Sequence, residues 1–389
     1  MSSGSIDQFT LRIGGMDWQH WKSAEVTRQV DAVSGSFSLG LADPWQEGAQ
    51  ALPLTAGQAC ELLIDGTGVL KGYIGQANPS FSATDHGITV SGRDASADLV
   101  DCSAIHNPGQ WINQTALQLA QIFSGPFGVA VTASADVGAP FATFKLEQGE
   151  TAFDALDRVL KQRELLAMPD GSGGIDLTKI GQKKASVAVE QGKNILTGSA
   201  SYNMDDRFSD YIVQGQQQGN DQVYGLKSAA VTAGTTDAAV TRYRPMLLRA
   251  ENQVDAASAR RRAEWECTVR AARAVTVTVT VQGFHMGGEG KGGLWEPNML
   301  VQATIPFLRI DQELLISKVT YSKSTAGSIT TLELKDPKAF MQEPQKKESA
   351  GGGGASAKDY KIEPEGLQEA STSEARRVNR GDMELDFDV

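Results

Sequence analysis

Histidine and cysteine, the residue types that most often carry chemistry, are few in this chain and widely spaced. The four histidines are His20, His86, His106 and His285. None belongs to an H-E-x-x-H motif, and the cysteines form no C-x-x-C pair. A protein zinc site needs three or four such ligands brought together. The spacing therefore predicts neither a zinc ribbon nor a catalytic metal site.

The glycine-rich stretch FHMGGEGKGG (284–293) is the one segment that suggests a phosphate-binding loop. Such a loop needs the pattern G-x-x-x-x-G-K-[ST], so that backbone amides surround the phosphates and a hydroxyl holds the metal ion. Here His285 stands six residues before Lys291, where glycine is required, and Gly292 follows the lysine. We interpret the stretch as a loop between strands.

Other catalytic and basic motifs are also absent or incomplete. The chain has no G-x-S-x-G nucleophile elbow. Carboxylates such as Glu150 and Asp154 are explained by a place at a helix N-terminus, where they oppose the helix dipole. The arginines within 260–273 are interspersed with Glu264 and Glu266, which predicts pairing along a helix or a subunit interface. The sequence therefore predicts no enzyme and no cofactor.

The composition predicts a globular, acidic protein with several domains. The chain has 389 residues, of which 40% are hydrophobic, and a formal net charge of −11. This length suits two to four domains, and the hydrophobic content is sufficient for several cores. Proteins that grip nucleic acid need a surplus of lysine and arginine. The charge therefore argues against a nucleic-acid binder, because an acidic surface repels phosphates.

The cysteines and the N-terminal residues predict where the protein is made. Cys60, Cys102 and Cys267 are odd in number and lie far apart, which is typical of a reducing cytosol with buried, unpaired thiols. Residues 1–20 contain no apolar core of a secretory signal. No apolar run approaches the ~20 residues that a membrane span requires. We expect assembly in the cytoplasm and no stable membrane insertion.

Hydrophobic periodicity predicts a β-rich region at the start of the chain. Residues 8–94 contain short alternating runs separated by turns, at a spacing typical of a sandwich or small barrel. A hairpin is expected within 59–77, turning at Asp65-Gly66-Thr67-Gly68, because Asp-Gly readily adopts positive φ.

A mixed α/β region is expected next, followed by a second β-rich region. Amphipathic spacing predicts helices at 94–104, 114–123 and 149–165. Thr151 and Asp154 form a plausible capping box for the last of these helices. The strand pattern resumes after Asn194. The elements expected beyond this point are a helix near 254–273, a strand with the Val/Thr alternation of VTVTVTVQG, and a hairpin around Ser324–Gly327.

The composition changes after Phe340. The following stretch is poor in large apolar residues and holds four successive glycines, which predicts a flexible linker. The chain ends in MELDFDV (383–389), where apolar and acidic residues alternate. This segment is either a ragged, solvated terminus or a strand that adds to the sheet edge of another chain. In the second interpretation the partner interface consists of Met383, Leu385, Phe387 and Val389.

Several stretches, taken together and in this order, resemble the baseplate hub proteins of phage Mu-type contractile tails, members of the late control protein D and VgrG-like hub superfamily. These stretches are VSGSFSLG (33–40), GQACELLIDG with LKGYIG (57–75), ITVSGRDASADLVDCSA (88–104), GQWINQTALQLAQIF (109–123), GETAFDAL (149–156), DDRFSDYIVQGQ (205–216), VTRYRPM (240–246), GGLWEPNMLV (292–301) and ELLISKVTY (313–321). Each is weak alone. Together they cover nearly all of 9–340, and the tail beyond 341 lies outside the resemblance.

The resemblance implies a mainly β fold with α+β elements, in which two tube-like β-barrel modules flank a mixed α/β middle region and a flexible C-terminal tail follows. The expected domains are a first module (1–95), the middle region (96–194), a second module (195–340) with an inserted helix-containing segment (about 220–274), and a linker and tail (341–389).

The resemblance also implies a structural role in the tail baseplate of a virion. Three copies would form a ring of six modules that matches the sixfold tail tube on one side and docks a threefold central spike on the other. The partners would be the spike protein, the tail tube or distal tube protein, and other baseplate proteins. DNA would pass through the lumen without specific binding, and the protein would serve tail assembly and genome ejection.

Two other function classes remain open from the sequence. A tail-associated peptidoglycan hydrolase would require a recognisable pair of acids or a zinc site. A carbohydrate-binding adhesin would suit a β-rich fold with six tryptophans, although these are scattered along the sequence. They are Trp18, Trp21, Trp45, Trp111, Trp265 and Trp295.

Overall fold

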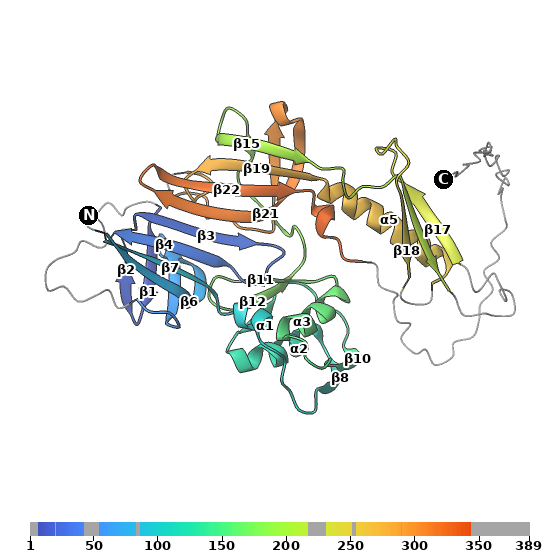
Figure 1. Cartoon of the computed structure of the whole chain (residues 1–389), viewed down its shortest axis with the longest axis horizontal. Coiled ribbons are helices and arrows are strands. Elements are labelled where there is room, and N and C mark those ends of the chain that lie inside the picture. Colours follow the sequence, from blue (N-terminus) through green and yellow to red (C-terminus); the bar gives the residue numbers. More distant parts are fainter. Residues whose placement is uncertain are drawn as a thin grey trace, which may run out of the picture. The chain divides into compact units, whose positions relative to one another are not determined.

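A computed structural model of the chain describes residues 7–19, 21–42, 54–82, 86–216, 231–250, 254–288 and 290–343. Most of their regular structure is β, with a few helices (Figure 1). The largest sheet in these ranges has 14 strands, and its strand order runs from β15 to β2 without closing on itself. None of the described helices combines the length and hydropathy needed to cross a membrane.

The first β-rich region contributes seven strands. They are β1 (Phe9–Ile13), β2 (Met16–Trp18), β3 (Ser23–Gln29), β4 (Ser36–Ala42), β5 (Ala59–Ile64), β6 (Thr67–Phe81) and β7 (His86–Asp94). Ile64 pairs with Thr67, so Asp65 and Gly66 form a two-residue turn. Both turn residues have positive φ, 49° and 81°, as the tight turns that suit twisted hairpins require. The predicted hairpin is confirmed.

The middle region is a small α/β unit with its own core. Its elements are α1 (Ala97–Asp101), β8 (Gln110–Gln114), α2 (Ala116–Ser124), the 3-10 helix η1 (Gly125–Phe127), β9 (Val131–Ala133), β10 (Phe141–Lys145), α3 (Ala152–Lys161), β11 (Leu166–Pro169) and β12 (Ile175–Thr178). The Thr151 side chain accepts the Asp154 amide, and the Asp154 side chain accepts the Thr151 amide. This confirms the predicted capping box, a feature that stabilises a helix by about 1 kcal/mol.

The second β-rich region begins earlier than its sequence pattern indicates. Its elements are β13 (Lys183–Lys184), β14 (Val189–Glu190), β15 (Ile195–Tyr202), β19 (Val275–Gln282), β20 (Met299–Ile305), η2 (Pro306–Leu308), β21 (Ile310–Ser324), β22 (Gly327–Lys335) and η3 (Pro337–Phe340). Val277, Val279 and Val281 are buried, while the intervening threonines stay partly exposed, as the alternation predicted. β13 and β14 pair with β20 although they were expected in the middle region; strands of two residues show no periodicity.

A separate three-stranded sheet contains β16 (Asp210–Gly215), β17 (Val231–Thr236) and β18 (Pro245–Arg249), and the helix α5 (Ala256–Arg273) packs on it. We expected 195–220 to pair with 275–340, but within this stretch only β15 does so. β16 pairs with β17 and β18 instead. The reason is that Tyr211 and Val213 bury against the small residues Ala259 and Ala263 of α5.

The two β-rich regions contain the same arrangement of five strands. β3 to β7, called the first module, follow the order β3-β4-β7-β6-β5. β15 with β19 to β22, called the second module, follow the order β15-β19-β22-β21-β20, with a branch at β21. Every neighbouring pair in both modules is antiparallel. The sequence showed no repeat at the level of residues, so the structure reveals it.

The strand registers of the two modules also coincide. Ala42 pairs with Gly87 in the first module at the position where Gln282 pairs with Ile329 in the second. The longest strand of each module, β6 or β21, has 15 residues and is followed by a strand of nine. Each long strand is irregular at the same place in this alignment, between 74 and 76 or between 316 and 318. The modules therefore correspond position by position.

Candidate functional site

One seam joins the two modules within the chain. β21 pairs with β22 through residues 315–324, so β22 occupies one side of it. β20 pairs with residues 310–315 and β3 with residues 318–323, and both must therefore lie on the other side, one after the other. Figure 1 shows β3 beside β21, where the blue and orange parts of the sheet meet. The first module is thus attached to the second by strand pairing.

The seam is dry and closely packed. Val26 of β3 pairs with Tyr321 of β21, and both are fully buried. The Tyr321 ring lies 5.6 Å from the ring of Phe284, and its hydroxyl donates to the carbonyl of Trp295. The two modules share one hydrophobic core, to which both contribute buried side chains. Burial of each large apolar side chain contributes about 1.5–3 kcal/mol, so the seam is a major source of stability.

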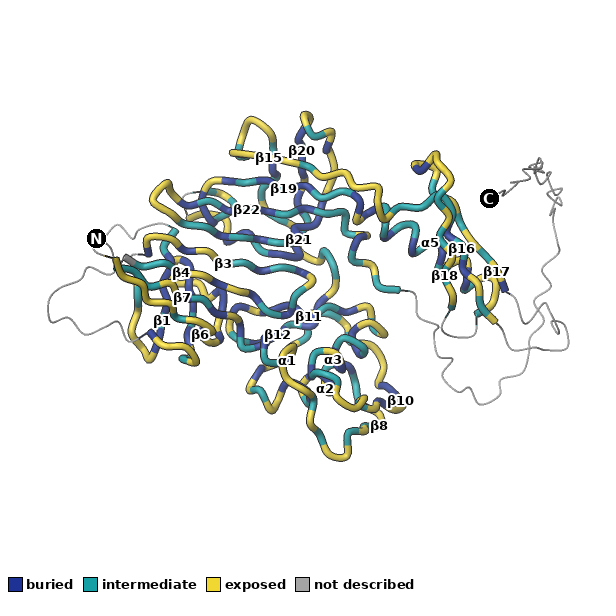
Figure 2. The backbone as a smooth tube through the Cα atoms, viewed as in Figure 1, coloured by how far each residue is buried: buried dark blue, intermediate teal, exposed yellow. Residues whose placement is uncertain are grey.

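The counterparts of the two seam strands have no such neighbour in the described part of the chain. β15, the counterpart of β3, is the last strand of the sheet. Residues 76–81 of β6, the counterpart of the half of β21 that pairs with β3, have no strand on the β5 side. Both segments are largely exposed, and Phe81 is 85% exposed (Figure 2). Unpaired strand edges are templates for pairing with another chain.

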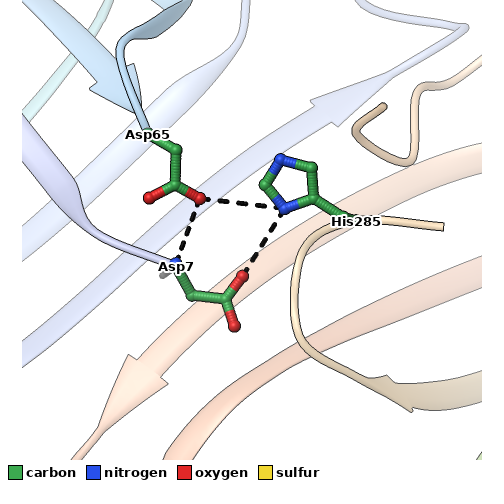
Figure 3. Close-up of side chains that lie close together, drawn as sticks. All are labelled: Asp7, Asp65 and His285. Carbon is green, nitrogen blue, oxygen red and sulfur yellow. Dashed lines mark hydrogen bonds and ion pairs between the residues drawn. The ribbon is translucent and has the colours of Figure 1, made fainter. Parts of the chain in front are cut away.

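A second constellation brings together Asp7, Asp65 and His285 (Figure 3). Asp7 immediately precedes β1, Asp65 lies in the β5–β6 turn, and His285 follows β19. His285 Nδ1 lies 3.7 Å from Asp7 Oδ1 and 3.7 Å from Asp65 Oδ2. The side chains are 15%, 22% and 11% exposed, in that order of residues. The three residues come from both ends of the sequence.

Backbone amides hold the two carboxylates of this cluster. Asp65 accepts the amides of Asp7 and Gln8, at 3.0 and 2.8 Å, and Asp7 accepts the amide of Phe284 at 3.1 Å. A bridge to Leu294 fixes the backbone of His285. Nδ1 of His285 is buried and makes no hydrogen bond. Spacing along the sequence could not reveal this cluster, because its members are separated by 58 and 220 positions.

The segment 284–293 has a structural role in the residues that are described. Phe284 is buried in the shared core, and its carbonyl accepts the amide of Trp295. Met286 and Gly293 are joined by a further backbone hydrogen bond. The segment is therefore a turn between strands, as expected, and its histidine contributes to the cluster.

The arginines of α5 pair along the helix, as predicted. Arg260 contacts Glu264 at 3.2 Å, and Arg270 contacts Glu266 at 2.7 Å, both four residues apart. Arg273 donates to the carbonyl of Ala339. The Trp265 indole donates to the carbonyl of Met341, so α5 also holds the segment that follows β22.

A cavity of about 450 Å³ lies where β9, β11 and β12 of the middle region approach residues 296–298. Three carboxylates line it, and neighbouring groups already bind all of them; Glu296 pairs with Lys183 at 3.9 Å. Asp170 accepts the amides of Ser172 and Gly174, and Asp176 accepts the hydroxyls of Thr132 and Ser134. These acids stabilise turns and strand ends, which explains them without acid–base catalysis.

The tail interface, the tryptophans and the cysteines are the remaining candidates from the sequence. The predicted tail interface lies outside the described residues; it consists of Met383, Leu385, Phe387 and Val389. None of the five described tryptophans is exposed, so they form no surface platform for a sugar. We expected buried thiols, but only Cys60 is buried, where desolvation raises its pKa to about 12. Cys102 is exposed because it directly follows the short helix α1.

Three family models match successive parts of the chain. The model described as Mu phage baseplate assembly protein GpP-like, N-terminal, matches residues 8–94. Baseplate hub protein gp44-like, second domain, matches residues 96–179. Mu phage baseplate assembly protein GpP, fourth domain, matches residues 255–343. These matches include most strands of both modules.

Individual proteins show the same similarity. The chain is 36% identical over 323 residues to the baseplate hub protein gp44 of Escherichia phage Mu, covering 80% of this chain and 83% of the relative. The 43 kDa tail protein of prophage MuSo2 from Shewanella oneidensis has a TM-score of 0.77 and 33% identity, covering 87% of this chain and 100% of that one. A tail protein from Neisseria meningitidis MC58 shares the fold, with a TM-score of 0.71, 22% identity, and coverage of 87% and 99%.

Proposed function

Because the chain belongs to the baseplate hub family of Mu-like phages, we propose that three copies assemble through their paired modules into a ring of six. The protein is a structural component of the virion tail baseplate, not an enzyme, as the relatives' names indicate. It works in association with other baseplate and tail proteins. The ring, its symmetry and its partners are the proposal developed below.

The observation that carries the proposal is the repeat of module and seam. β3 pairs with β21 inside the chain, whereas β15, which corresponds to β3, is an edge. The exposed half of β6 corresponds to the part of β21 that receives β3. Applying the internal seam a second time places β15 of one copy against β6 of the next copy. The pairing is antiparallel, like the seam that it repeats.

The internal seam also specifies the register of this contact. Val26 pairs with Tyr321, and Glu25 pairs with Ser322. The aligned positions are Ala200 and Pro79 for the first pair, and Ser199 and Ser80 for the second. We therefore propose that Ser199 of one copy lies opposite Ser80 of its neighbour. Both serines are exposed in the single chain.

A head-to-tail contact of this kind closes into a ring when its rotation divides a full turn. Two equivalent modules per chain and three chains give six equivalent positions with true threefold symmetry. Such a ring can bind a sixfold tail tube on one face and a threefold spike on the other. In this proposal the modules curve to form the tube-like wall that the sequence resemblance implied.

The charge of the protein suits a channel through which DNA passes. With a formal net charge of −11, the ring repels phosphates and does not retain the DNA. We propose that the ring lines this channel and serves tail assembly and genome ejection, with the central spike protein and the tail tube or distal tube protein as its neighbours. No particular carboxylate is assigned to the lumen.

Light scattering of the purified full-length chain tests the ring directly. The expected mass is three times the 41.5 kDa of one chain. A strictly monomeric protein at the concentrations found during tail assembly contradicts the proposal. So does a dimer, because two chains joined head to tail would leave one β15 edge and one β6 edge unpaired.

Cysteine cross-linking tests the register. Ser80→Cys and Ser199→Cys, combined with Cys102→Ser to remove the exposed native thiol, should oxidise to species of two and three linked chains on non-reducing gels. Residues directly opposite on antiparallel strands have the Cα separation that a disulfide needs. Ser80→Cys with Ser201→Cys is the control, displaced by two residues along the same face. Equal cross-linking of both pairs, in a protein that is still trimeric, would refute the register alone.

We propose separately that the C-terminal residues Met383, Leu385, Phe387 and Val389 add a strand to a neighbouring baseplate protein. Their alternation with acids motivates this proposal. A chain truncated after Lys346 keeps the contacts of residues 339–341 with α5 and removes the tail. It should trimerise normally but complement tail assembly poorly. Full complementation by the truncated chain rules the proposal out.

A further inference from the structure

We propose that Asp7, Asp65 and His285 bind a divalent transition-metal ion, with Zn²⁺ as the best-fitting ion, and that this ion clamps the first module to the second. The three potential ligand atoms, one from each residue, lie within 4.8 Å of one another. Asp7 and Asp65 belong to the N-terminal side of the sheet, and His285 follows β19 of the second module. A bound ion would therefore connect segments that the chain brings together only on folding.

The state of His285 Nδ1 is the observation that carries the proposal. This atom is buried, has no hydrogen-bond partner, and is 3.7 Å from carboxylate oxygens of both aspartates. A lone pair directed at two carboxylates is electrostatically unfavourable. An N–H···O hydrogen bond would require separations of about 2.7–3.2 Å. A protonated imidazole would form ion pairs with both aspartates but a hydrogen bond with neither.

A metal ion fits the same geometry with less movement. Zinc bonds of about 2.0–2.1 Å in a tetrahedral site place ligand atoms about 3.3 Å apart. The two separations of 3.7 Å between His285 Nδ1 and the carboxylate oxygens exceed this by only a few tenths of an ångström, and all three ligand atoms lie within 4.8 Å of one another. Closing to a hydrogen bond would require a contraction about twice as large. The cluster is thus close to the spacing of a coordination site.

The surroundings orient the ligands as outer-shell groups do in metal proteins. The amides of Asp7, Gln8 and Phe284 hold the carboxylates, and each carboxylate retains lone pairs that these amides do not use. Lys323 is the neighbouring cation, and it donates to the backbone carbonyl of Asp7 at 2.7 Å. The two carboxylates can therefore supply the charge that balances a divalent ion.

The ligand set selects the class of ion. One imidazole with two carboxylates suits Zn²⁺, Mn²⁺ or Fe²⁺ better than Ca²⁺ or Mg²⁺, which prefer oxygen ligands alone. Three protein ligands leave a fourth position for water. The side chains are at most 22% exposed, so we assign the ion a structural role. Because it would bind only the folded arrangement, it would stabilise that arrangement in proportion to its affinity and concentration.

The test uses the full-length protein without an affinity tag, freed of metal with EDTA and then dialysed. Thermal unfolding is followed with and without ZnCl₂, and zinc binding is measured by calorimetry. We expect one ion per chain and a rise in Tm of at least about 2 °C at saturating zinc. His285→Gln and Asp65→Asn should abolish both effects. MgCl₂ should have little effect on any of these proteins.

His86→Gln is the matched control, because it removes another histidine from the sheet but not from the cluster. It should bind zinc like the parent protein. Co²⁺ absorption gives a readout that does not depend on stability: d–d bands of a four-coordinate ion should form in the parent and in His86→Gln but not in His285→Gln. Absence of a zinc effect in the parent protein overturns the proposal, as does unchanged binding by His285→Gln. Either result leaves the trimer test unaffected.

Discussion

The two modules have the same strands in the same register, yet their corresponding edges differ. In β3 the buried and exposed positions alternate, and Val26, which pairs with Tyr321 of β21, is fully buried. In β15 nearly every residue is exposed, and the position corresponding to Val26 is Ala200. Identical topology therefore does not determine the surface of a strand. The neighbour that covers it does.

The composition of the two edges indicates when each contact forms. β3 carries the apolar residues Ala24 and Val26, and both are buried when the chain folds. The centre of β15, Gly198 to Ser201, contains only small residues, so the free chain exposes little apolar surface there. A strand edge with small side chains can remain unpaired in the free chain without causing aggregation. It can then form backbone hydrogen bonds with a strand of another chain. The difference separates a folding contact from an assembly contact.

The largest expected effect comes from breaking the covered seam. Tyr321→Ala removes a fully buried ring and leaves the Trp295 carbonyl without its donor. We expect a loss of about 3–5 kcal/mol in the free energy of unfolding, measured with urea at a concentration where the chain is monomeric. Phe81→Ala, at the exposed end of the corresponding strand half, should change monomer stability by less than about 0.5 kcal/mol.

The same pair of variants sharpens the comparison in the trimer. Phe81→Ala should weaken trimer formation if β6 receives β15 of a neighbour, and dilution of the trimer followed by light scattering measures this. If both substitutions destabilise the monomer equally, the distinction between a covered and an open seam is wrong.

A second difference concerns two aligned aspartates, Asp94, which is the last residue of β7, and Asp336, which directly follows β22. Asp94 is buried, and burial raises its pKa to about 6, although the Gly35 amide, Arg28 and the Lys71 amide oppose the shift. Asp336 is partly exposed and accepts the Lys338 amide at the start of η3. The Asp94 carboxyl should therefore make stability depend on pH.

The sign follows from proton binding. Since the folded state of Asp94 keeps its proton to higher pH than the unfolded chain, its contribution to stability is complete below about pH 4 and is lost by about pH 6. This shift of about two pKa units corresponds to a loss of up to roughly 3 kcal/mol. Asp94→Asn should flatten the unfolding free energy between pH 4 and 6. An unchanged slope in Asp94→Asn would show that another group titrates.

Local features were predictable from the sequence because neighbouring residues determine them. The Asp65-Gly66 turn, the capping box of Thr151 and Asp154, and the valine–threonine alternation of β19 each depend on a few consecutive side chains. The helices of the middle region also followed from such patterns. These features also supported the resemblance to a hub family.

The features that required the structure depend on residues far apart in the chain. The seam pairs Val26 with Tyr321, and the cluster joins Asp65 to His285. The sequence near these residues does not identify their partners. Any alternating strand can pair with any other, and a single histidine forms no spacing pattern with other ligands. β16 was grouped with the wrong strands for the same reason: its pattern shows that one face is buried but not which element covers it.

The smallest expected effect compares the turns that lead into the two long strands. Gly66 precedes β6 with φ 81°, and a Cβ there would meet no atom within 4 Å, so Gly66→Ala adds only backbone strain. Arg309 precedes β21 with φ 56°, an uncommon conformation for a residue other than glycine. Gly66→Ala should therefore destabilise the protein by about 1–2 kcal/mol. Arg309→Gly should stabilise it by no more than about 1 kcal/mol, because the added freedom of the unfolded chain offsets part of the relief. Urea unfolding is measured in EDTA, which excludes any metal contribution from Asp65. The two variants should change the free energy of unfolding in opposite directions. If both destabilise the protein, the strain in the two turns is not equivalent, and the positional correspondence between the modules does not extend to their loops.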